Sequence, residues 1–537
     1  MGSEEAYRRY DVGNSVIVST AKEEATKIGI EIIKDGGNAI DAAVAVGFAI
    51  GVCEPNASGI GGGGFMTVRK GHTGEVFCID FREVAPTGAS PNMWKTDEHG
   101  DILDDEKGTG GKAICVPGEV AGLIYALENY GTMPLKKVMS PSIELAEKGF
   151  KVTSLLEGDI KDCEEKFLKY GGGKDVYLKN GLPYTQGEIF RNPFLAKTLR
   201  IISEMGRDGF YKGKVAQSIV TAVKDAGGYM TLEDLKNYKV NVYSPICGQY
   251  RGYEIISTPP PSSGGTHVVQ MLNILENFNV KSMEVNSAQY IHVLSEIFKI
   301  SLADRAEYMG DMNFVDVPIK GLTSKSYGKK LSNKINEEIC LEYNCHDPWK
   351  YESSETTHFS IGDADGNMVS VTKTISGFFG SGVVTKDTGI VLNNQMRGFA
   401  KGHGKKNSVI AGKKPLSSMS PTLILKENKP FAILGTPGGA KIISTVVQVI
   451  SKLVDHKMSL KEAVYSPRIF NDMNNELLFE NRISQNTINQ LKSMGHKVNP
   501  LGQWDRKMGS VQSVLYKSHG EMEGVADPRR DGVVMGY

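Results

Sequence analysis

The sequence has no excess of either charge and no long apolar run, and each absence excludes a class of protein. Lysine and arginine together number 62, as do aspartate and glutamate, among 537 residues. The overall charge therefore favours neither nucleic acid nor an acidic membrane surface as a partner. The most apolar run, residues 39–53, contains Asp41 and is too short to span a bilayer. With 40% hydrophobic residues, the chain fits a large globular protein.

Cysteine is also scarce. The seven cysteines are scattered and odd in number, which predicts buried or free thiols rather than a disulfide framework. Cys340, Cys345 and His346 are too isolated to predict a metal site, and we expect no cofactor. The start, MGSEEAYRRYDVG, has no apolar signal-peptide core. This predicts a cytoplasmic chain, or an extracellular or periplasmic one if a signal peptide has been removed.

Apolar periodicity predicts the order of elements. Residues 20–37 have helical spacing and end at a Gly-Gly pair, and residues 39–52 form a second helix that is apolar nearly all round and hence buried. A glycine-rich loop leads into a hairpin within 58–83, residues 115–345 look mainly helical, and strands return from 356. Without repeats or linkers, this order predicts helices covering stacked sheets in one layered fold.

A second hairpin is indicated by ETTHFSIGDADGNMVSVTKTISG, residues 355–377. A two-residue loop would mix apolar and polar residues on each face. A three-residue loop with Gly366 in the left-handed conformation instead pairs Phe359 with Val371 and Ile361 with Val369, which makes one face apolar. The same register sets two hydroxyls opposite each other, because Thr356 then lies across from Thr374.

The glycines of GIGGGG, residues 59–64, match the dinucleotide pattern GxGxxG, with Asp80 at roughly the distance of a ribose-binding acid. That fingerprint needs a strand before the glycines and a helix after them. Here a helix precedes and a hairpin follows, so the order argues against a dinucleotide site.

Three other stretches supply the parts of an acyl-transfer site: DFREVAP, KKPLSSMSPT and LGTPGGAKI. Arg82 in the first is a planar fork for a carboxylate. Ser417 and Ser418 in the second are further donors. Gly438 and Gly439 in the third can turn backbone N–H groups onto an oxyanion.

Together with DGGNAIDAAVAV, EPNASGIGGGGFM, TTHFSIGDADGNMVSVT and GIVLNNQM, these stretches resemble the γ-glutamyltransferase (γ-glutamyltranspeptidase) family, in order and over almost the whole length. The resemblance implies an α/β (α+β) fold, the four-layer αββα sandwich of N-terminal nucleophile hydrolases. It also implies a precursor that cuts itself before Thr356. A large segment, 1–355, and a small segment, 356–537, would then interleave in one fold as a heterodimer.

The resemblance assigns roles to single residues. Thr356 would be the nucleophile with its freed α-amine as the base, and Thr374 matches the threonine that hydrogen-bonds it. The implied substrate-binding residues are Arg82, Ser417 and Ser418 for the α-carboxylate and Gln395 at the α-amino group. Gly438 and Gly439 match the family's catalytic oxyanion hole. Two positions depart from the family: Ser376 replaces a carboxylate-binding asparagine, and Gly398 in NNQMRGF replaces the acid that holds the substrate ammonium.

The implied activity is γ-glutamyl transfer or hydrolysis, from glutathione or another γ-glutamyl compound to water, an amino acid or a peptide. Gly398 and the FFG sequence after the second strand keep two alternatives open. One is the branch that cleaves or transfers poly-γ-glutamate, and the other is an acylase for glutaryl side chains. An unprocessed, inactive binding protein is an alternative from a different class.

Overall fold

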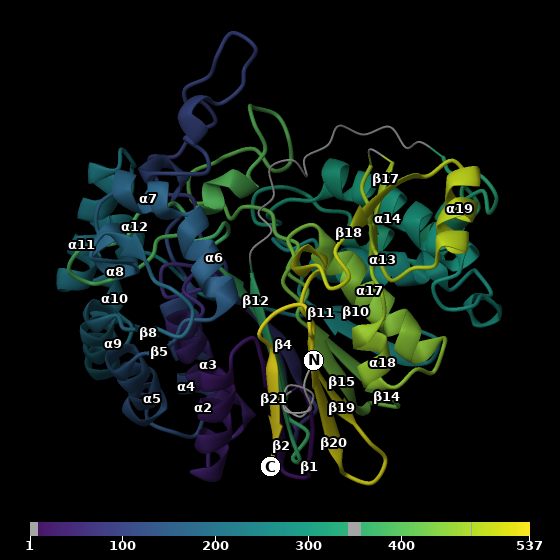
Figure 1. Ribbon diagram of the computed structural model, residues 1–537, viewed down its shortest axis with the longest axis horizontal. Helices are drawn as coiled ribbons and strands as arrows, with labels where there is room; N and C mark the ends of the chain where they lie inside the picture. The colour runs from purple at the N-terminus through teal and green to yellow at the C-terminus, as the bar shows by residue number, and fades with distance from the viewer. Residues whose placement is uncertain (1–8, 342–355, 474) are drawn as a thin grey trace.

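Two antiparallel seven-stranded sheets lie face to face in the computed structural model, which describes residues 9–341, 356–473 and 475–537 (Figure 1). In spatial order, the first sheet consists of β21 (Val533–Gly536), β2 (Val16–Thr20), β12 (Thr357–Asp363), β13 (Met368–Thr374), β3 (Gly63–Arg69), β4 (Val76–Phe81) and β9 (Asn241–Tyr243). The second consists of β1 (Tyr10–Gly13), β20 (Met522–Ala526), β19 (Gln512–Tyr516), β15 (Lys429–Gly435), β14 (Thr422–Lys426), β11 (Tyr253–Ser257) and β10 (Ile246–Tyr250).

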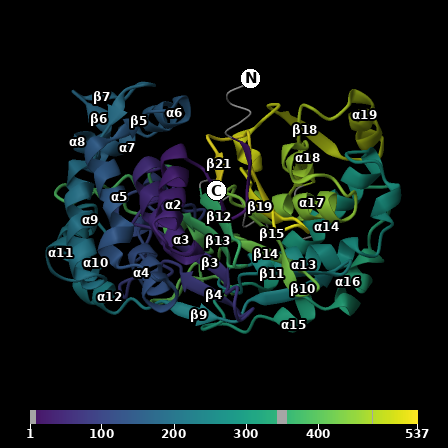
Figure 2. The ribbon, with the colours of Figure 1, turned by 90° about the horizontal axis from the view of Figure 1, so that it is seen from below.

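Helices cover the outer face of each sheet, as Figures 1 and 2 show. On the first sheet's side lie α2 (Glu23–Lys34), α3 (Ala39–Cys53), α4 (Glu119–Tyr130), α5 (Leu135–Lys148), α6 (Ser154–Asp162), α7 (Glu164–Lys169), α8 (Gly173–Tyr177), α9 (Pro193–Met205), α10 (Asp208–Tyr211), α11 (Gly213–Asp225) and α12 (Leu232–Lys236). On the other side lie α13 (Gly264–Leu275), α14 (Ala288–Tyr308), α15 (Ile319–Leu322), α16 (Lys325–Ser332), α17 (Lys441–Val454), α18 (Leu460–Tyr465) and α19 (Gln485–Ser493).

The remaining described strands form three small separate sheets: β5 (Phe150–Lys151) with β8 (Ile189–Phe190), β6 (Leu178–Lys179) with β7 (Leu182–Pro183), and β16 (Ile469–Asn471) with β17 (Glu476–Glu480) and β18 (Lys497–Leu501). Separate apolar cores fill the space between each sheet and its helices. A third core, which includes Ile17, Met368 and Ile433, lies between the sheets. The predicted αββα sandwich is confirmed.

The two N-terminal helices follow the prediction. All residues of α3 are buried, and Asn38 caps the helix by accepting hydrogen bonds from the N–H groups of Ile40 and Asp41. The Asp41 carboxylate inside this apolar run accepts from the backbone N–H groups of Thr132 and Met133, so the buried acid is satisfied. Among the described residues, no helix is both long and apolar enough to cross a membrane.

The central hairpin has the predicted register. Phe359 pairs with Val371 and Ile361 with Val369, and Gly366 has a φ of +80° in the three-residue loop. Both faces of the two strands are buried, because one face packs on helices and the other faces the second sheet. The polar face of the hairpin is therefore part of the interior of the sandwich.

The polar layer between the sheets is satisfied by side chains. His358 is hydrogen-bonded through Nδ1 to Thr372 Oγ1 (2.8 Å) and through Nε2 to Ser360 Oγ (3.1 Å). Ser360 Oγ in turn donates to the carbonyl of Gln512 on the second sheet. Burial lowers the pKa of His358 to about 3, so this histidine is neutral and structural.

Residues 115–345 are mainly helical, as predicted, but the prediction missed β9, β10 and β11. The β10–β11 turn is formed by Arg251 and Gly252, whose φ angles are +52° and +84°. Two successive residues with positive φ make the tight turn that suits a two-residue hairpin. The strand β9 lies at the edge of the first sheet, and the β10–β11 hairpin lies at one side of the second, with β10 outermost.

Candidate active site

One pocket brings together every predicted site residue except Gly438. It is lined by Arg82, Thr356, Thr374, Ser376, Gln395, Ser417, Ser418 and Gly439. The other lining residues are Arg397, Gly398, Leu416, Met419 and Ile442. Segments distant in the sequence thus meet at the start of β12.

Thr356 directly precedes β12 and is 4% exposed. Thr357 pairs with Lys373, so the same register continued by one residue sets Thr356 across from Thr374. The Thr374 hydroxyl oxygen accepts a 2.7 Å hydrogen bond from the backbone N–H of Ser376. This contact fixes the Thr374 side chain on the pocket side of the hairpin.

The GIGGGG run is explained by close packing on this hairpin. A Cβ added at Gly62 would lie 2.2 Å from the carbonyl oxygen of Thr374, and one at Gly64 would lie 2.5 Å from that of Thr372. Any larger residue would push β13 away from Thr356. Asp80 is also structural, because it accepts hydrogen bonds from Lys414 and from the backbone N–H of Arg82.

Arg82 is held by backbone carbonyls. Its Nε and Nη2 donate to the carbonyl oxygens of Pro415 (3.2 Å) and Leu416 (3.3 Å), and its Nη1 lies 3.2 Å from Glu83 Oε2. Burial raises the pKa of Glu83 to about 7, which Arg82 opposes. Because Pro415 and Leu416 directly precede Ser417, the same contacts fix the guanidinium relative to the serine pair.

Hydrogen bonds from neighbouring groups orient the side chains of Ser417 and Ser418. Ser417 Oγ accepts from the backbone N–H of Met419 (3.1 Å), and Ser418 Oγ accepts from Arg305 Nη2 (3.1 Å). Arg305, on α14, is 1% exposed and also donates to Ser263 Oγ. Sequence reasoning missed Arg305. The only signal for it is a charged residue on a nearly all-buried helix, and that signal names no partner.

Gly438 and Gly439 connect β15 to α17 with φ angles of +136° and +57°. Their carbonyls accept from the N–H groups of Lys441 and Ile442 in the first turn of α17. Neither glycine N–H donates a hydrogen bond to another described residue. Gly439 lines the pocket, and Gly438 directly precedes it. Two adjacent donors beside a helix N-terminus can stabilise an oxyanion.

The NNQ stretch is fixed by its asparagines, which sequence reasoning also missed. Asn393 Oδ1 accepts from the N–H groups of Gln395 and Cys115, both at 3.0 Å. Asn394 Oδ1 accepts from the N–H of Gly377 at 2.8 Å. Consecutive buried asparagines after an apolar strand-like run are the signal that could have revealed this anchor.

The NNQMRGF departure changes the charge of the pocket. Residues 395–398 form a single 3₁₀ turn that brings both Arg397 and Gly398 to the pocket wall. Gly398 lacks the positive φ of the left-handed glycines. A Cβ there would meet Pro415 Cβ at 3.3 Å and lie 3.8 Å from Arg82 Nη2. Sequence reasoning identified the missing acid but not the added arginine.

A possible metal-ligand cluster lies elsewhere on α14. The ligand atoms of His292, Glu296 and His496 lie within 4.8 Å of one another. His292 is hydrogen-bonded to His496 Nε2 and to a backbone carbonyl, and Lys299 Nζ lies 2.6 Å from Glu296. An ammonium thus occupies the cation position beside the carboxylate. The described cysteines are free thiols, and Cys345 and His346 lie outside the described residues.

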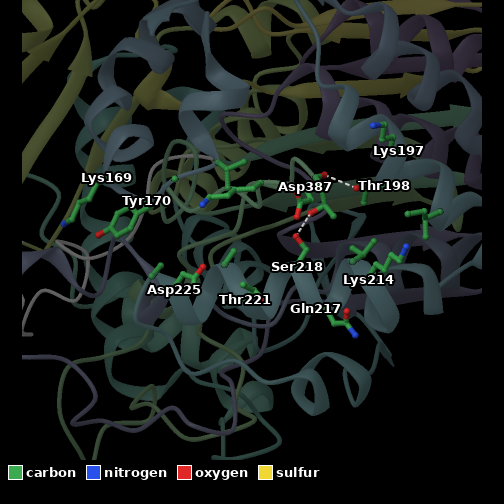
Figure 3. Close-up of a pocket in the computed structure, with 18 residues that line it drawn as sticks. Lys169, Tyr170, Lys197, Thr198, Lys214, Gln217, Ser218, Thr221, Asp225 and Asp387 are labelled. Carbon is green, nitrogen blue, oxygen red and sulfur yellow. Dashed lines mark hydrogen bonds between the residues drawn. The ribbon is translucent and has the colours of Figure 1, made fainter. Parts of the chain in front are cut away.

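A second, larger pocket of about 710 Å³ lies between α9, α11 and residues 384–388 (Figure 3). Its charged lining residues are Lys169, Lys197, Lys214, Asp225, Lys386 and Asp387. Ser218 and Thr198 hydrogen-bond to Thr388, so these hydroxyls are already partnered. No predicted site residue lies in this pocket.

Comparison with known proteins identifies the family of the chain. The family model described as Gamma-glutamyltranspeptidase matches residues 25–537. The glutathione hydrolase proenzyme of Bacillus subtilis (strain 168) is 43% identical, covering 99% of this chain and 93% of that protein. The cephalosporin acylase from Bacillus halodurans superposes with a TM-score of 0.89 at 27% identity, over 99% of this chain and 97% of the acylase.

The γ-glutamyltranspeptidase of Helicobacter pylori is 42% identical with a TM-score of 0.58, covering 60% of this chain and 92% of that one. These likenesses define the architecture as that of the N-terminal nucleophile hydrolases. The chain belongs to the γ-glutamyltranspeptidase family. The expected reaction class, γ-glutamyl hydrolysis or transfer, is confirmed at the level of this family.

Proposed function

We propose that Thr356, freed by cleavage of the Glu355–Thr356 bond, is the nucleophile of a γ-glutamyl hydrolase and transferase. The observation that carries the proposal is the absence of a side-chain base: no histidine, aspartate, glutamate or lysine is among the described residues that line the pocket. His358, the nearest histidine in sequence, is neutral with both ring nitrogens hydrogen-bonded. This lack of a side-chain base among the described lining residues supports the α-amine of Thr356 itself as the base.

The α-amine suits this work, because its pKa of about 7.7–8.0 lies close to neutral pH. It takes the proton of the Thr356 hydroxyl as Oγ1 attacks the γ-carbonyl of the donor. The proton then passes to the departing amine, which leaves a γ-glutamyl ester on Thr356. Water or an acceptor amine attacks that ester, the proton returns through the same α-amine, and the enzyme is regenerated.

In this proposal the other residues of the site bind the remaining groups of the substrate. Arg82, Ser417 and Ser418 bind the α-carboxylate, since a fixed guanidinium and two oriented hydroxyls converge there. The N–H groups of Gly438 and Gly439 stabilise the oxyanion. Gln395 and Ser376 complete the wall around the α-carbon. Thr374 hydrogen-bonds the nucleophile.

Mass spectrometry of the purified chain tests the nucleophile. We expect fragments 1–355 and 356–537 to remain associated, with Thr356 as the new terminus. Thr356→Ala should leave one 58.5 kDa chain without turnover, whereas Thr356→Ser should process slowly because a hydroxyl remains. A processed, active Thr356→Ala protein would refute the assignment.

The same experiment decides between an enzyme and a binding protein. A wild-type chain that stays intact and turns over no γ-glutamyl anilide would support the binding protein. An intact chain that turns over these anilides would contradict both hypotheses, the freed Thr356 nucleophile and the inactive binding protein.

A further inference from the structure

Arg305 supports the serine pair of the pocket beside Thr356 without lining that pocket. From α14, its Nη2 donates to Ser418 Oγ, and its Nε donates to Ser263 Oγ at 2.6 Å. Ser263 Oγ donates in turn to the carbonyl oxygen of Ser417 at 2.7 Å. One buried guanidinium therefore holds the side chain of Ser418 directly and the backbone of Ser417 through a single hydroxyl.

The loop before α13, residues 258–263, pairs with the same serine stretch. The N–H of Ser417 donates to the carbonyl oxygen of Pro261 at 3.0 Å, and the N–H of Ser263 donates to the carbonyl oxygen of Ser417 at 2.8 Å. Both backbone groups of Ser417 are thus hydrogen-bonded to one loop, which Arg305 also contacts. Buried contacts therefore fix the serine pair relative to the guanidinium.

The direction of these hydrogen bonds is unambiguous, because a guanidinium and a backbone N–H can donate but cannot accept. Ser418 Oγ is the acceptor in its contact with Arg305, and Ser417 Oγ is the acceptor in its contact with the N–H of Met419. Each hydroxyl has one proton, which it can donate only in another direction. Since both serines line the pocket together with Arg82, a ligand group at this place meets donors.

Such a set of donors discriminates between two forms of one substrate group. An ionised carboxylate offers only acceptors, whereas a carboxamide of the same shape has an NH₂ group that donates. A carboxamide would set its own N–H groups against the donors or leave a buried donor unpaired, which is costly. Arg305 maintains this selection, because without it the Ser418 hydroxyl can turn and accept from the amide.

We propose that Arg305 is a positioning residue that makes the pocket select γ-glutamyl donors with an ionised α-carboxylate over donors whose α-carboxyl group is an amide. It acts on Ser418 directly and on Ser417 through Ser263, and it contacts no reacting atom. The inference rests on the proposed function, because it takes the serine pair to face the α-carboxylate. Loss of Arg305 should weaken substrate binding and relax the selection while the chemistry at Thr356 continues.

Matched donors test this inference: γ-glutamyl-p-nitroanilide and its α-carboxamide. We expect wild-type kcat/KM to be about fiftyfold or more higher for the carboxylate donor. Arg305→Met should raise KM for this donor by about tenfold, leave kcat within about threefold, and reduce the preference by about tenfold. Arg305→Lys keeps a cationic donor without the fork and should recover part of the preference.

Arg251→Met is the matched control. It removes a partly buried arginine that donates to Asp455 and to the carbonyl of Phe278, outside the pocket beside Thr356. KM and the preference for the carboxylate donor should both stay at their wild-type values. A control variant that loses the preference as Arg305→Met does would show that a general loss of stability, and not the serine pair, is responsible.

A double-mutant cycle tests whether Arg305 acts through Ser418. The rise in KM for Arg305→Met combined with Ser418→Ala should be well below the product of the two single rises, because both changes remove the same hydroxyl contact. A full product would overturn the inference, and so would a wild-type preference in Arg305→Met. If Arg305→Met does not fold, Ser263→Ala carries the test, since it removes the link to Ser417 and keeps the buried charge. An unchanged preference in that variant is then the refuting result.

Calorimetry with L-glutamate and its α-amide, L-isoglutamine, separates failure of this inference from failure of the proposed function, because binding needs no turnover. Tighter binding of glutamate that is reduced in Arg305→Met supports the role of Arg305 even if no anilide is cleaved. Equal binding of the two compounds by the wild-type protein refutes it, as does a preference that Arg305→Met retains in full.

Discussion

The catalytic pocket beside Thr356 and the larger pocket between α9 and α11 contain similar polar side chains but hold them differently. In the larger pocket the lysines are exposed, cations and acids are mixed, and the hydroxyls of Thr198 and Ser218 are hydrogen-bonded within the pocket wall. In the catalytic pocket, backbone groups orient Arg82 and Ser417, and two glycine N–H groups have no partner among the described residues. Prearranged donors, rather than cavity volume, favour the pocket beside Thr356 as the site of chemistry that we propose.

The largest effect after loss of Thr356 should come from the glycine pair. Gly439→Ala places a side chain at a φ of +57°, which costs about 1–2 kcal/mol of backbone strain, and it moves one of the two proposed oxyanion donors. We expect kcat to fall by about 10²-fold, measured with γ-glutamyl-p-nitroanilide.

The control for this change is Gly402→Ala, at a φ of +76° with no atom within 4 Å of the new Cβ. It imposes similar strain on a loop outside both pockets and should leave kcat within twofold. Equal losses in the two variants would mean that strain, and not the donor, matters.

Replacing one cation in each pocket tests which of the two pockets binds the substrate. Arg82→Lys keeps the charge but loses the planar fork, and we expect KM to rise by about thirtyfold, or about 2 kcal/mol. Lys214→Gln removes a cation from the larger pocket and should leave KM unchanged. A KM effect of Lys214→Gln as large as that of Arg82→Lys would assign substrate binding to the larger pocket.

The smallest effect expected is on donor choice at Gly398. Gly398→Asp should raise the preference for a free-amine over a glutaryl anilide by about tenfold, or about 1.4 kcal/mol, because the new carboxylate pairs with the substrate ammonium. The backbone allows the change, since Gly398 does not have a positive φ.

Gly398→Asn has a similar shape without the charge and should not shift the preference. A wild-type preference already above a hundredfold for the free amine would show that another group binds the ammonium. The measurement is the ratio of kcat/KM for the two anilides, determined for the wild-type protein, Gly398→Asp and Gly398→Asn.

Much of the fold could be predicted because the signals are local. The period-2 alternation on both sides of Gly366 determines the hairpin register, and the apolar run of α3 predicts a buried helix. The short strands β9 to β11 could not be predicted in the same way, because few residues carry their alternation and tertiary pairing decides their structure.

The candidate site, too, could be predicted only where a local sequence pattern names the residue. Ser417 and Ser418 could be named from the sequence, but Arg305, which orients Ser418, comes from a helix more than a hundred residues earlier. Arg397 reaches the pocket through one 3₁₀ turn whose direction depends on the anchoring of Asn394. Contacts of this kind follow from packing and leave no spacing pattern in the chain.

The pairing of strands from both sides of residue 355 has a consequence for how the protein could refold. In the first sheet β12 pairs with β2 and β13 with β3, and in the second β14 pairs with β11 and β20 with β1. Each of these ladders joins a strand before residue 355 to one after it. A chain cut at this point can keep its fold, but two unfolded fragments would have to associate in solution before they could refold. Refolding of the intact chain would be unimolecular and refolding of two separate fragments bimolecular, so after the proposed cleavage the recovery of the fold would depend on concentration.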